Sequence, residues 1–133
     1  MKTLSIGELS EMSGVASQAI RFYERENLMP KPQRTPANYR RYPGEAVGRL
    51  QFIVHAKQWG FTLDEIRELL ILQDANGDRA EAKRIAGEKL EKIRAQIRNL
   101  SRIEAVLSKT LDDCSGEGPM KGCPIVEAIA HEG

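Results

Sequence analysis

The amino-acid sequence predicts a mainly α-helical chain with three parts: a head of short helices, one long helix and a cysteine-bearing tail. Apolar residues recur at alternating steps of four and three over residues 86–111, which is the pattern of a paired long helix. Two cysteines follow this run directly. Ahead of it, glycines and a proline-rich stretch separate shorter helical patterns. We therefore place the head in residues 1–76, the long helix in 77–111 and the tail in 112–133.

The net charge of +1 hides an uneven distribution. Residues 1–60 carry nine Lys and Arg against five Asp and Glu, whereas residues 61–133 carry eleven against fourteen. A basic head followed by an acidic remainder is typical of a chain that binds nucleic acid with its head, although ordinary domains also show such a split.

The head opens with two short helices around a turn. Ser5 can cap a helix over residues 6–12, and Glu8 completes a capping box with it. Gly14 ends this helix and a second one follows from residue 17, which is the spacing of a helix-turn-helix. The exposed face of the second helix carries side chains that donate hydrogen bonds to phosphates or base edges: Ser17, Gln18, Arg21 and Arg25. The alternative is a generic helical hairpin with a solvated basic face.

Residues 29–43 contain four prolines and no helical period. Proline stops helices and is restricted to sheet edges, so we expect a small hairpin, or wing, that projects from the helices. Its outward groups are Arg34, Asn38, Tyr39, Arg40 and Arg41. Arginine and tyrosine on a stiff projection suit phosphate clamping and groove contact.

Two helices are predicted after the wing, at about residues 43–59 and 62–73. Thr62 and Glu65 form a second capping box at the start of the later one. The apolar period of the earlier helix predicts three inward residues: Val47, Leu50 and Val54.

The long helix is predicted from Arg79 to Leu111. Its apolar seam consists of Ala86, Leu90, Ile93, Ile97, Leu100, Leu107 and Leu111. At about 1.5 Å per residue the helix is roughly 45–50 Å long, too long for a short chain to cover by itself. We therefore expect it to pair with a second copy as a coiled coil in a homodimer. The alternative is an intramolecular hairpin packed on the head.

The tail carries Cys114 and Cys123 at the two ends of a loop that contains three glycines and one proline. Pro124 suits the first position of a final short helix over residues 124–130. In a reducing compartment, two neighbouring cysteines are expected to bind a metal or undergo redox chemistry, not to form a structural disulfide. A thiolate pair suits Cu(I), Ag(I), Au(I) or Hg(II), whereas Zn(II) or Cd(II) needs further ligands. The candidates for these are Asp112, Asp113 and His131.

Residues 6–9 (IGEL), 20–24 (IRFYE), 38–42 (NYRRY) and 60–66 (GFTLDEI) occur in one order along the chain. They resemble the matching segments of the MerR family of bacterial metal- and stress-responsive transcription regulators, and the cysteine spacing resembles the loop of its metal-sensing members. The resemblance implies a winged helix-turn-helix head, antiparallel pairing of the long helices, and a homodimer that binds double-stranded promoter DNA together with RNA polymerase. The DNA contacts that it implies are Ser17, Gln18, Arg21, Tyr23, Asn38, Tyr39 and Arg40.

The resemblance also bears on the identity of the metal. Family members that sense divalent ions take a third cysteine from the start of the partner's long helix, and copper-efflux members have a serine there, whereas this chain has Arg79 or its neighbour Asp78. Two thiolates around a monovalent ion leave one negative charge, which Arg79 can compensate. We therefore favour Cu(I) bound by Cys114 and Cys123. A divalent ion, Zn(II), Hg(II), Cd(II) or Pb(II), is the alternative, and a Zn(II)-like site is favoured if Asp78, Asp112, Asp113 or His131 points into it. A redox- or thiol-responsive regulator is a further alternative.

The expected function is that of a metal-responsive regulator that activates a metal-resistance or efflux promoter by distorting its DNA when metal is bound. A metal-storage or chaperone protein with an incidental basic head is a rival. An enzyme is not expected, because neither His55, in a predicted core helix, nor His131, in the tail, supplies a positioned base. No apolar run reaches membrane-spanning length, so we expect a cytoplasmic protein with no membrane partner.

Overall fold

The computed structural model describes residues 3–131 of the chain. The chain forms two compact units, one ending at Ile85 and one beginning at Ala86. The division falls inside the long helix. The predicted domain boundaries stay predictions, and their outermost residues, 1–2 and 132–133, lie outside the described part. No helix among the described residues is long and apolar enough to cross a membrane.

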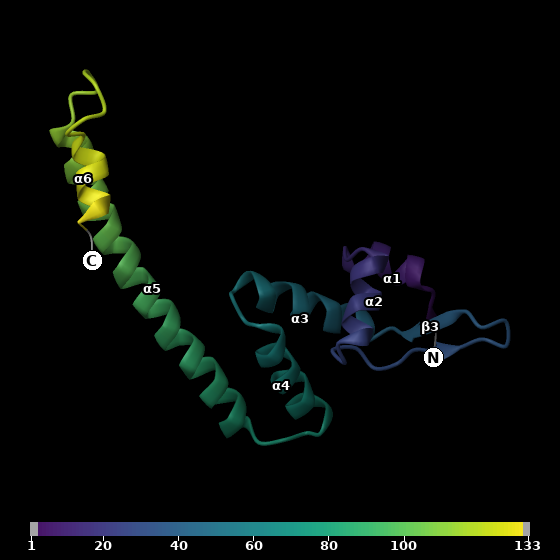
Figure 1. Ribbon diagram of the computed structural model, residues 1–133. Helices are drawn as coiled ribbons and strands as arrows, with labels where there is room; N and C mark the ends of the chain where they lie inside the picture. The colour runs from purple at the N-terminus through teal and green to yellow at the C-terminus, as the bar shows by residue number, and fades with distance from the viewer. Residues whose placement is uncertain (1–2, 132–133) are drawn as a thin grey trace. The chain divides into compact units, whose positions relative to one another are not determined.

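Helices dominate the chain, which confirms the predicted fold class (Figure 1). They are α1 (Ile6–Ser13), α2 (Ser17–Arg25), α3 (Ala46–Gln58), α4 (Leu63–Asp74), α5 (Arg79–Asp113) and α6 (Pro124–Ala130). The strands are β1 (Thr3–Leu4), β2 (Gln33–Arg34) and β3 (Arg40–Pro43).

The helix-turn-helix forms because its first helix is capped at both ends as the sequence predicts. The backbone N–H of Glu8 donates to Oγ of Ser5 (3.1 Å), and the N–H of Ser5 donates to Oε1 of Glu8 (2.9 Å). Gly14 then adopts a φ of 75°, a left-handed conformation that glycine tolerates, and its N–H donates to the carbonyl of Ser10 (2.9 Å). The chain is thereby redirected into α2, which begins at Ser17.

A three-stranded antiparallel sheet in the order β1-β3-β2 forms the wing and its anchor. The predicted hairpin is β2 with β3, and Figure 1 shows it reaching away from α1, α2 and α3. The sequence did not predict β1, which has only two residues and pairs Leu4 with Tyr42 of β3. Because Pro43 belongs to β3, α3 begins at Ala46, later than the pattern suggested.

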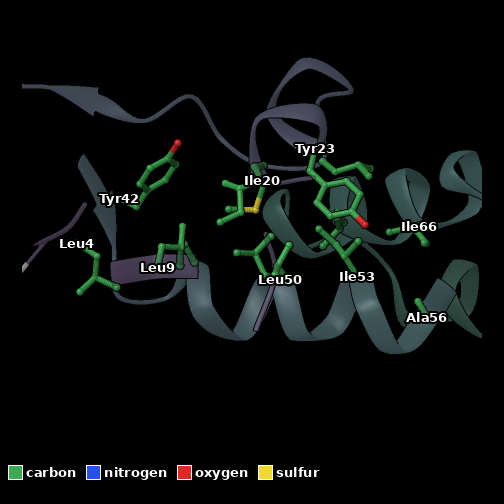
Figure 2. Close-up of a cluster of buried hydrophobic side chains, with 14 residues drawn as sticks. Leu4, Leu9, Ile20, Tyr23, Tyr42, Leu50, Ile53, Ala56 and Ile66 are labelled. Atoms are coloured by element: carbon green, nitrogen blue, oxygen red, sulfur yellow. The ribbon is translucent and has the colours of Figure 1, made fainter. Parts of the chain in front are cut away.

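One hydrophobic core holds the two strands β1 and β3 and the four helices α1 to α4 together. In Figure 2, side chains from several of these elements gather between the ribbons. Leu9 of α1, Ile20 of α2, Leu50 and Ile53 of α3, and Ile66 of α4 are completely shielded from solvent. This core packs α2 and β3 together in one compact unit.

The unit that begins at Ala86 contains most of α5, the loop of residues 114–123 and α6. α5 is one continuous helix of 35 residues and is about 50 Å long at about 1.5 Å per residue. It begins at Arg79 as predicted and ends at Asp113, beyond the predicted end at Leu111. Pro124 occupies the first turn of α6, as predicted. Figure 1 shows that the chain reverses after the loop, so that α6 runs opposite to the last turns of α5.

Candidate functional site

α2 presents the predicted row of polar side chains. Ser17 and Arg21 are half-buried, and Gln18 and Arg25 are exposed. Because residues four apart share one face of a helix, Ser17, Arg21 and Arg25 form a row with Gln18 beside it. The buried Ile20 lies on the other side of the helix and holds it in the core. This row offers the positive charge and hydrogen-bond donors that a phosphate-contacting surface needs.

Tyr23 of α2, which the resemblance also implies as a DNA contact, does not lie in this row. Its side chain is only 7% exposed and belongs to the core. The ring meets Phe22 edge-on, with centroids 5.7 Å apart, and the Lys57 ammonium lies 5.8 Å from its centroid. The DNA contact of Tyr23 stays a prediction, and little of the Tyr23 side chain is exposed to make such a contact.

The wing tip is a tight turn held by its own hydrogen bonds. The backbone N–H of Thr35 donates to the carbonyl of Tyr39 (2.9 Å), and the N–H of Tyr39 donates to Oγ1 of Thr35 (3.1 Å). Asn38 adopts a φ of 68°, and its carbonyl accepts from Nη1 of Arg34 (3.2 Å). The Tyr39 side chain is 71% exposed, so the turn displays it to an external partner.

The two arginines of β3 have separate partners. Nε and Nη2 of Arg41 donate to Oγ1 (3.0 Å) and to the carbonyl (2.9 Å) of Thr3, which fastens the wing to β1. Nε of Arg40 lies 3.4 Å from Oε2 of Glu24 on α2, and this buried atom finds no hydrogen-bond acceptor among residues 3–131. The remainder of the Arg40 side chain is partly exposed.

Glu24 is a residue of this surface that the sequence did not single out. Besides facing Arg40, its carboxylate accepts a hydrogen bond from the hydroxyl of Tyr42 on β3. Burial, together with this hydrogen bond, raises the pKa of Tyr42 well above its usual range. The sequence does show that Glu24 lies one helical turn after Arg21. Its partners Arg40 and Tyr42, however, lie 16 and 18 residues further along the chain, so no local pattern indicates these contacts.

The two cysteines stand at the two ends of the loop between α5 and α6. Cys114 follows the last residue of α5, and its N–H donates to the carbonyl of Thr110 (3.1 Å). Cys123 caps α6, where its carbonyl accepts from the N–H of Glu127 (3.1 Å). Its own N–H donates to the carbonyl of Met120 (2.9 Å). Both thiols are half-buried, and neither forms a disulfide within the described chain.

The loop offers two thiols as soft metal ligands. Within residues 3–131, no group of three or more His, Cys, Asp and Glu side chains is arranged to hold a metal ion. His131 is paired with Glu127 (Nε2 to Oε2, 3.2 Å), and Asp112 and Asp113 are exposed at the end of α5. Two soft ligands fit an ion that accepts two-coordinate geometry, whereas a tetrahedral Zn(II) site is incomplete within this part of one chain.

Asp78 and Arg79 lie at the start of α5. Oδ1 of Asp78 accepts a hydrogen bond from the N–H of Ala80 (2.9 Å), so this carboxylate helps to cap the helix. Arg79 is exposed. Because Cys114 follows the opposite end of a helix about 50 Å long, the role predicted for Arg79 or Asp78 at the thiols requires a second chain.

α5 also leaves its apolar seam in solvent. The exposed members are Leu90, Ile97, Leu100, Leu107 and Leu111. They recur at the spacing of a coiled-coil seam, and a row of exposed leucines this long is unfavourable unless another surface covers it. The seam therefore supports the predicted pairing with a second copy.

Two family models match the chain. The model of MerR HTH family regulatory proteins matches residues 4–71, and a model described as "MerR, DNA binding" matches residues 47–110. Among curated proteins, the chain is 36% identical to a mercuric resistance operon regulatory protein of Serratia marcescens, over 99% of this chain and 91% of that protein. It is also 36% identical to the HTH-type transcriptional regulator ZntR of Escherichia coli, over 93% of this chain and 90% of that protein.

Solved structures give the same result. The transcription regulator PbrR691 of Ralstonia metallidurans, in complex with lead(II), superposes with a TM-score of 0.79 at 31% identity, over 95% of this chain and 98% of that one. The regulator MerR of Bacillus megaterium, in complex with mercury(II), superposes with a TM-score of 0.69 at 33% identity, over 96% and 99%. The similarity spans the head, the long helix and the cysteine loop.

Proposed function

Because the chain belongs to the MerR family of helix-turn-helix regulatory proteins, we propose that it is a metal-responsive regulator that binds promoter DNA as a homodimer and holds a thiophilic ion, Cu(I), between Cys114 and Cys123. The observation that carries this proposal is the succession of a winged helix-turn-helix, a long helix with an exposed apolar seam, and a loop with two free thiols.

The DNA-binding part of the proposal rests on α2 and the wing. Ser17, Gln18 and Arg21 deliver hydrogen bonds and positive charge from a helix, and the turn that carries Asn38 and Tyr39 projects beside them from a stiff hairpin. A two-fold dimer presents this surface twice, so the expected target is a pair of inverted half-sites. Phosphate contacts supply most of the affinity and make it salt-dependent.

The metal part of the proposal rests on charge and coordination number. Two thiolates around Cu(I) form a unit with one negative charge, and Arg79 of a second chain is a suitable counter-charge. No group of three or more His, Cys, Asp and Glu side chains that could hold a metal ion occurs within residues 3–131, so a three-coordinate divalent ion finds no complete site in this part of one chain. These two features favour a monovalent ion.

Hg(II) is the second candidate, and the named relatives favour it. The Serratia marcescens relative is a mercuric resistance regulator, and the Bacillus megaterium structure contains mercury(II). Two thiolates neutralise Hg(II) in a linear site, so this ion also needs no third ligand. The neutral Hg(II) unit needs no counter-charge from Arg79, whereas the negatively charged Cu(I) unit does. The two candidates therefore differ in their dependence on Arg79.

The switch is proposed to act on the shape of the DNA. Deforming a promoter costs about 1–6 kcal/mol, so the ion must favour one of two dimer states by a comparable amount. Ordering of the 114–123 loop against α5 is the proposed source of that preference. The bound ion thereby lets RNA polymerase engage both promoter elements. We assign the chain to the cytoplasm and to a non-enzymatic role.

A titration of the reduced dimer with buffered Cu(I), Hg(II) and Zn(II), read by run-off transcription from its own promoter, tests the choice of ion. Activation by Cu(I) at the lowest free concentration, weakened by Arg79→Ala, is the expected result. Activation by Hg(II) that Arg79→Ala leaves unchanged would identify the second candidate. A response to Zn(II) alone would overturn the two-thiolate site.

A further inference from the structure

A carboxylate stands where the proposed DNA surface calls for positive charge. Glu24 lies on α2 one turn after Arg21, between the row of donors and the wing. Its side chain is 11% exposed. A buried carboxylate costs desolvation energy unless it is paired, and near phosphates it also repels the ligand. We therefore expect the Glu24 carboxylate to form contacts whose stabilisation offsets this desolvation cost.

The contacts of Glu24 show where that gain arises. One carboxylate oxygen accepts the hydroxyl hydrogen of Tyr42, and the other lies 3.4 Å from Nε of Arg40. Both partners belong to β3, on alternate positions of the strand and thus on one face of it. Arg41, between them, donates to Thr3 of β1. Glu24 is thus joined to β3 by both of its oxygens.

We propose that Glu24 is a positioning residue, which fixes the wing relative to α2 so that Arg40 and Tyr39 meet phosphates while Arg21 meets the groove. The inference rests on the DNA binding proposed above. Nε of Arg40 faces Glu24, and the Arg40 side chain is still 30% exposed, so part of it is accessible to a phosphate. Without the link, the hairpin keeps its own hydrogen bonds but loses a fixed angle to the helix.

Two charge-preserving variants test this role in the full-length dimer. Glu24→Asp keeps the negative charge and shortens the reach, and Tyr42→Phe removes only the hydroxyl. Glu26→Asp is the matched control, because Glu26 caps the C-terminal end of α2 and also pairs with an arginine, but that arginine is Arg67 of α4 (3.3 Å) and not a residue of the wing. Thermal unfolding of each variant verifies that it folds.

The readouts are affinity for the protein's own promoter duplex as a function of salt, and hydroxyl-radical protection of each phosphate. Both test variants are expected to bind about three- to tenfold more weakly. The slope of log affinity against log salt should fall by about one, since a wing contact to phosphate is lost. Protection should disappear at the phosphates touched by the wing and persist at those touched by α2, and Glu26→Asp should match the wild type.

Three results would overturn the inference. Folded variants with wild-type affinity and footprint would show that the link is not needed. Uniform weakening without a change in the footprint would indicate a general loss of stability. Tighter binding would indicate that the link holds Arg40 away from DNA. If the wild-type dimer itself shows no salt-dependent binding, the proposed function fails and this inference fails with it.

Discussion

Arg49 of α3 forms a bidentate ion pair with Asp74, the last residue of α4. Nη1 and Nη2 of Arg49 donate to the two carboxylate oxygens at 2.7 and 3.1 Å. Nε of the same guanidinium donates to the carbonyl of Leu28 (2.6 Å), in the segment between α2 and the wing. One side chain thus joins the end of α4, α3 and the segment that leads into the wing.

This ion pair predicts a dependence of stability on acid. The Arg49 hydrogen bonds hold the pKa of Asp74 below its usual value. The contribution to folding is therefore present above about pH 4 and is lost as pH falls through the lower pKa of the folded state. Because Asp74 is more than half exposed, the effect should stay below about 1 kcal/mol. Urea unfolding of Asp74→Asn should show a smaller loss of stability between neutral and acid pH than the wild type, and an identical loss would contradict the assignment.

Tyr42 predicts the opposite dependence, at alkaline pH. Its pKa is raised by burial and by the hydrogen bond to Glu24. The unfolded chain releases this proton near pH 10 while the folded chain retains it, so the stability contributed by neutral Tyr42 declines as pH rises above about 10. Tyr42→Phe should lose less stability than the wild type between about pH 9 and pH 11, measured by urea unfolding with near-neutral pH as the reference. Parallel curves would show that Tyr42 is not the titrating group.

Thr62 predicts a change of stability without a change of function. Its Oγ1 accepts from the N–H of Glu65 (3.1 Å) and completes the capping box of α4. Replacing a capping threonine by alanine costs about 1 kcal/mol. Thr62→Ala should therefore lower the free energy of unfolding by about 1 kcal/mol and leave promoter affinity unchanged. Glu68→Ala, at an exposed position of α4, serves as the control and should change neither quantity.

The seam on α5 predicts a defined effect on assembly. Leu100 is 63% exposed in the single chain and lies at a seam position. Leu100→Arg places a charge in the paired interface, so the dimer should dissociate at concentrations at which the wild type stays paired. Ser101→Arg adds the same charge at the neighbouring exposed position outside the seam and should leave the dimer intact. Sedimentation velocity distinguishes the two variants, and equal behaviour would reject the seam as the dimer interface.

Much of the fold was predictable because its signals are local. The pairs Ser5 with Glu8 and Thr62 with Glu65 are three residues apart, so the sequence shows both capping boxes directly. The long helix and the start of α6 at Pro124 follow from period and from proline chemistry in the same way.

The remainder depends on contacts between distant segments. β1 exists because two residues pair with β3, and no period of two can appear in so short a strand. The sequence favoured Val47, Leu50 and Val54 as inward residues of α3. Leu50 is buried as predicted, but its buried neighbours on the helix are Ala46, Ile53 and Ala56. The valines pack at the edge of the core. Which face of α3 is buried depends on the elements that pack against it, and the helical period alone does not specify them.

In the candidate site, too, local motifs were predictable and contacts between distant residues were not. The pattern located the donors of α2, the wing and the two cysteines, all of which are short-range motifs. The link from Glu24 to the wing joins residues 18 positions apart, and no local pattern reports it. The proposed choice of ion depends on Arg79 of a second chain, and no local pattern in one sequence reports a contact between two chains.

The most direct test of the central claim separates DNA binding from the metal response. Cys114→Ser and Cys123→Ser are compared with Met120→Leu, an exposed loop control that keeps both thiols, by measuring promoter affinity and run-off transcription with and without Cu(I) or Hg(II). Both serine variants should keep wild-type promoter affinity and lose activation by the ion, while Met120→Leu should keep both. Loss of promoter affinity in either serine variant, or activation that survives without one thiol, would contradict that claim.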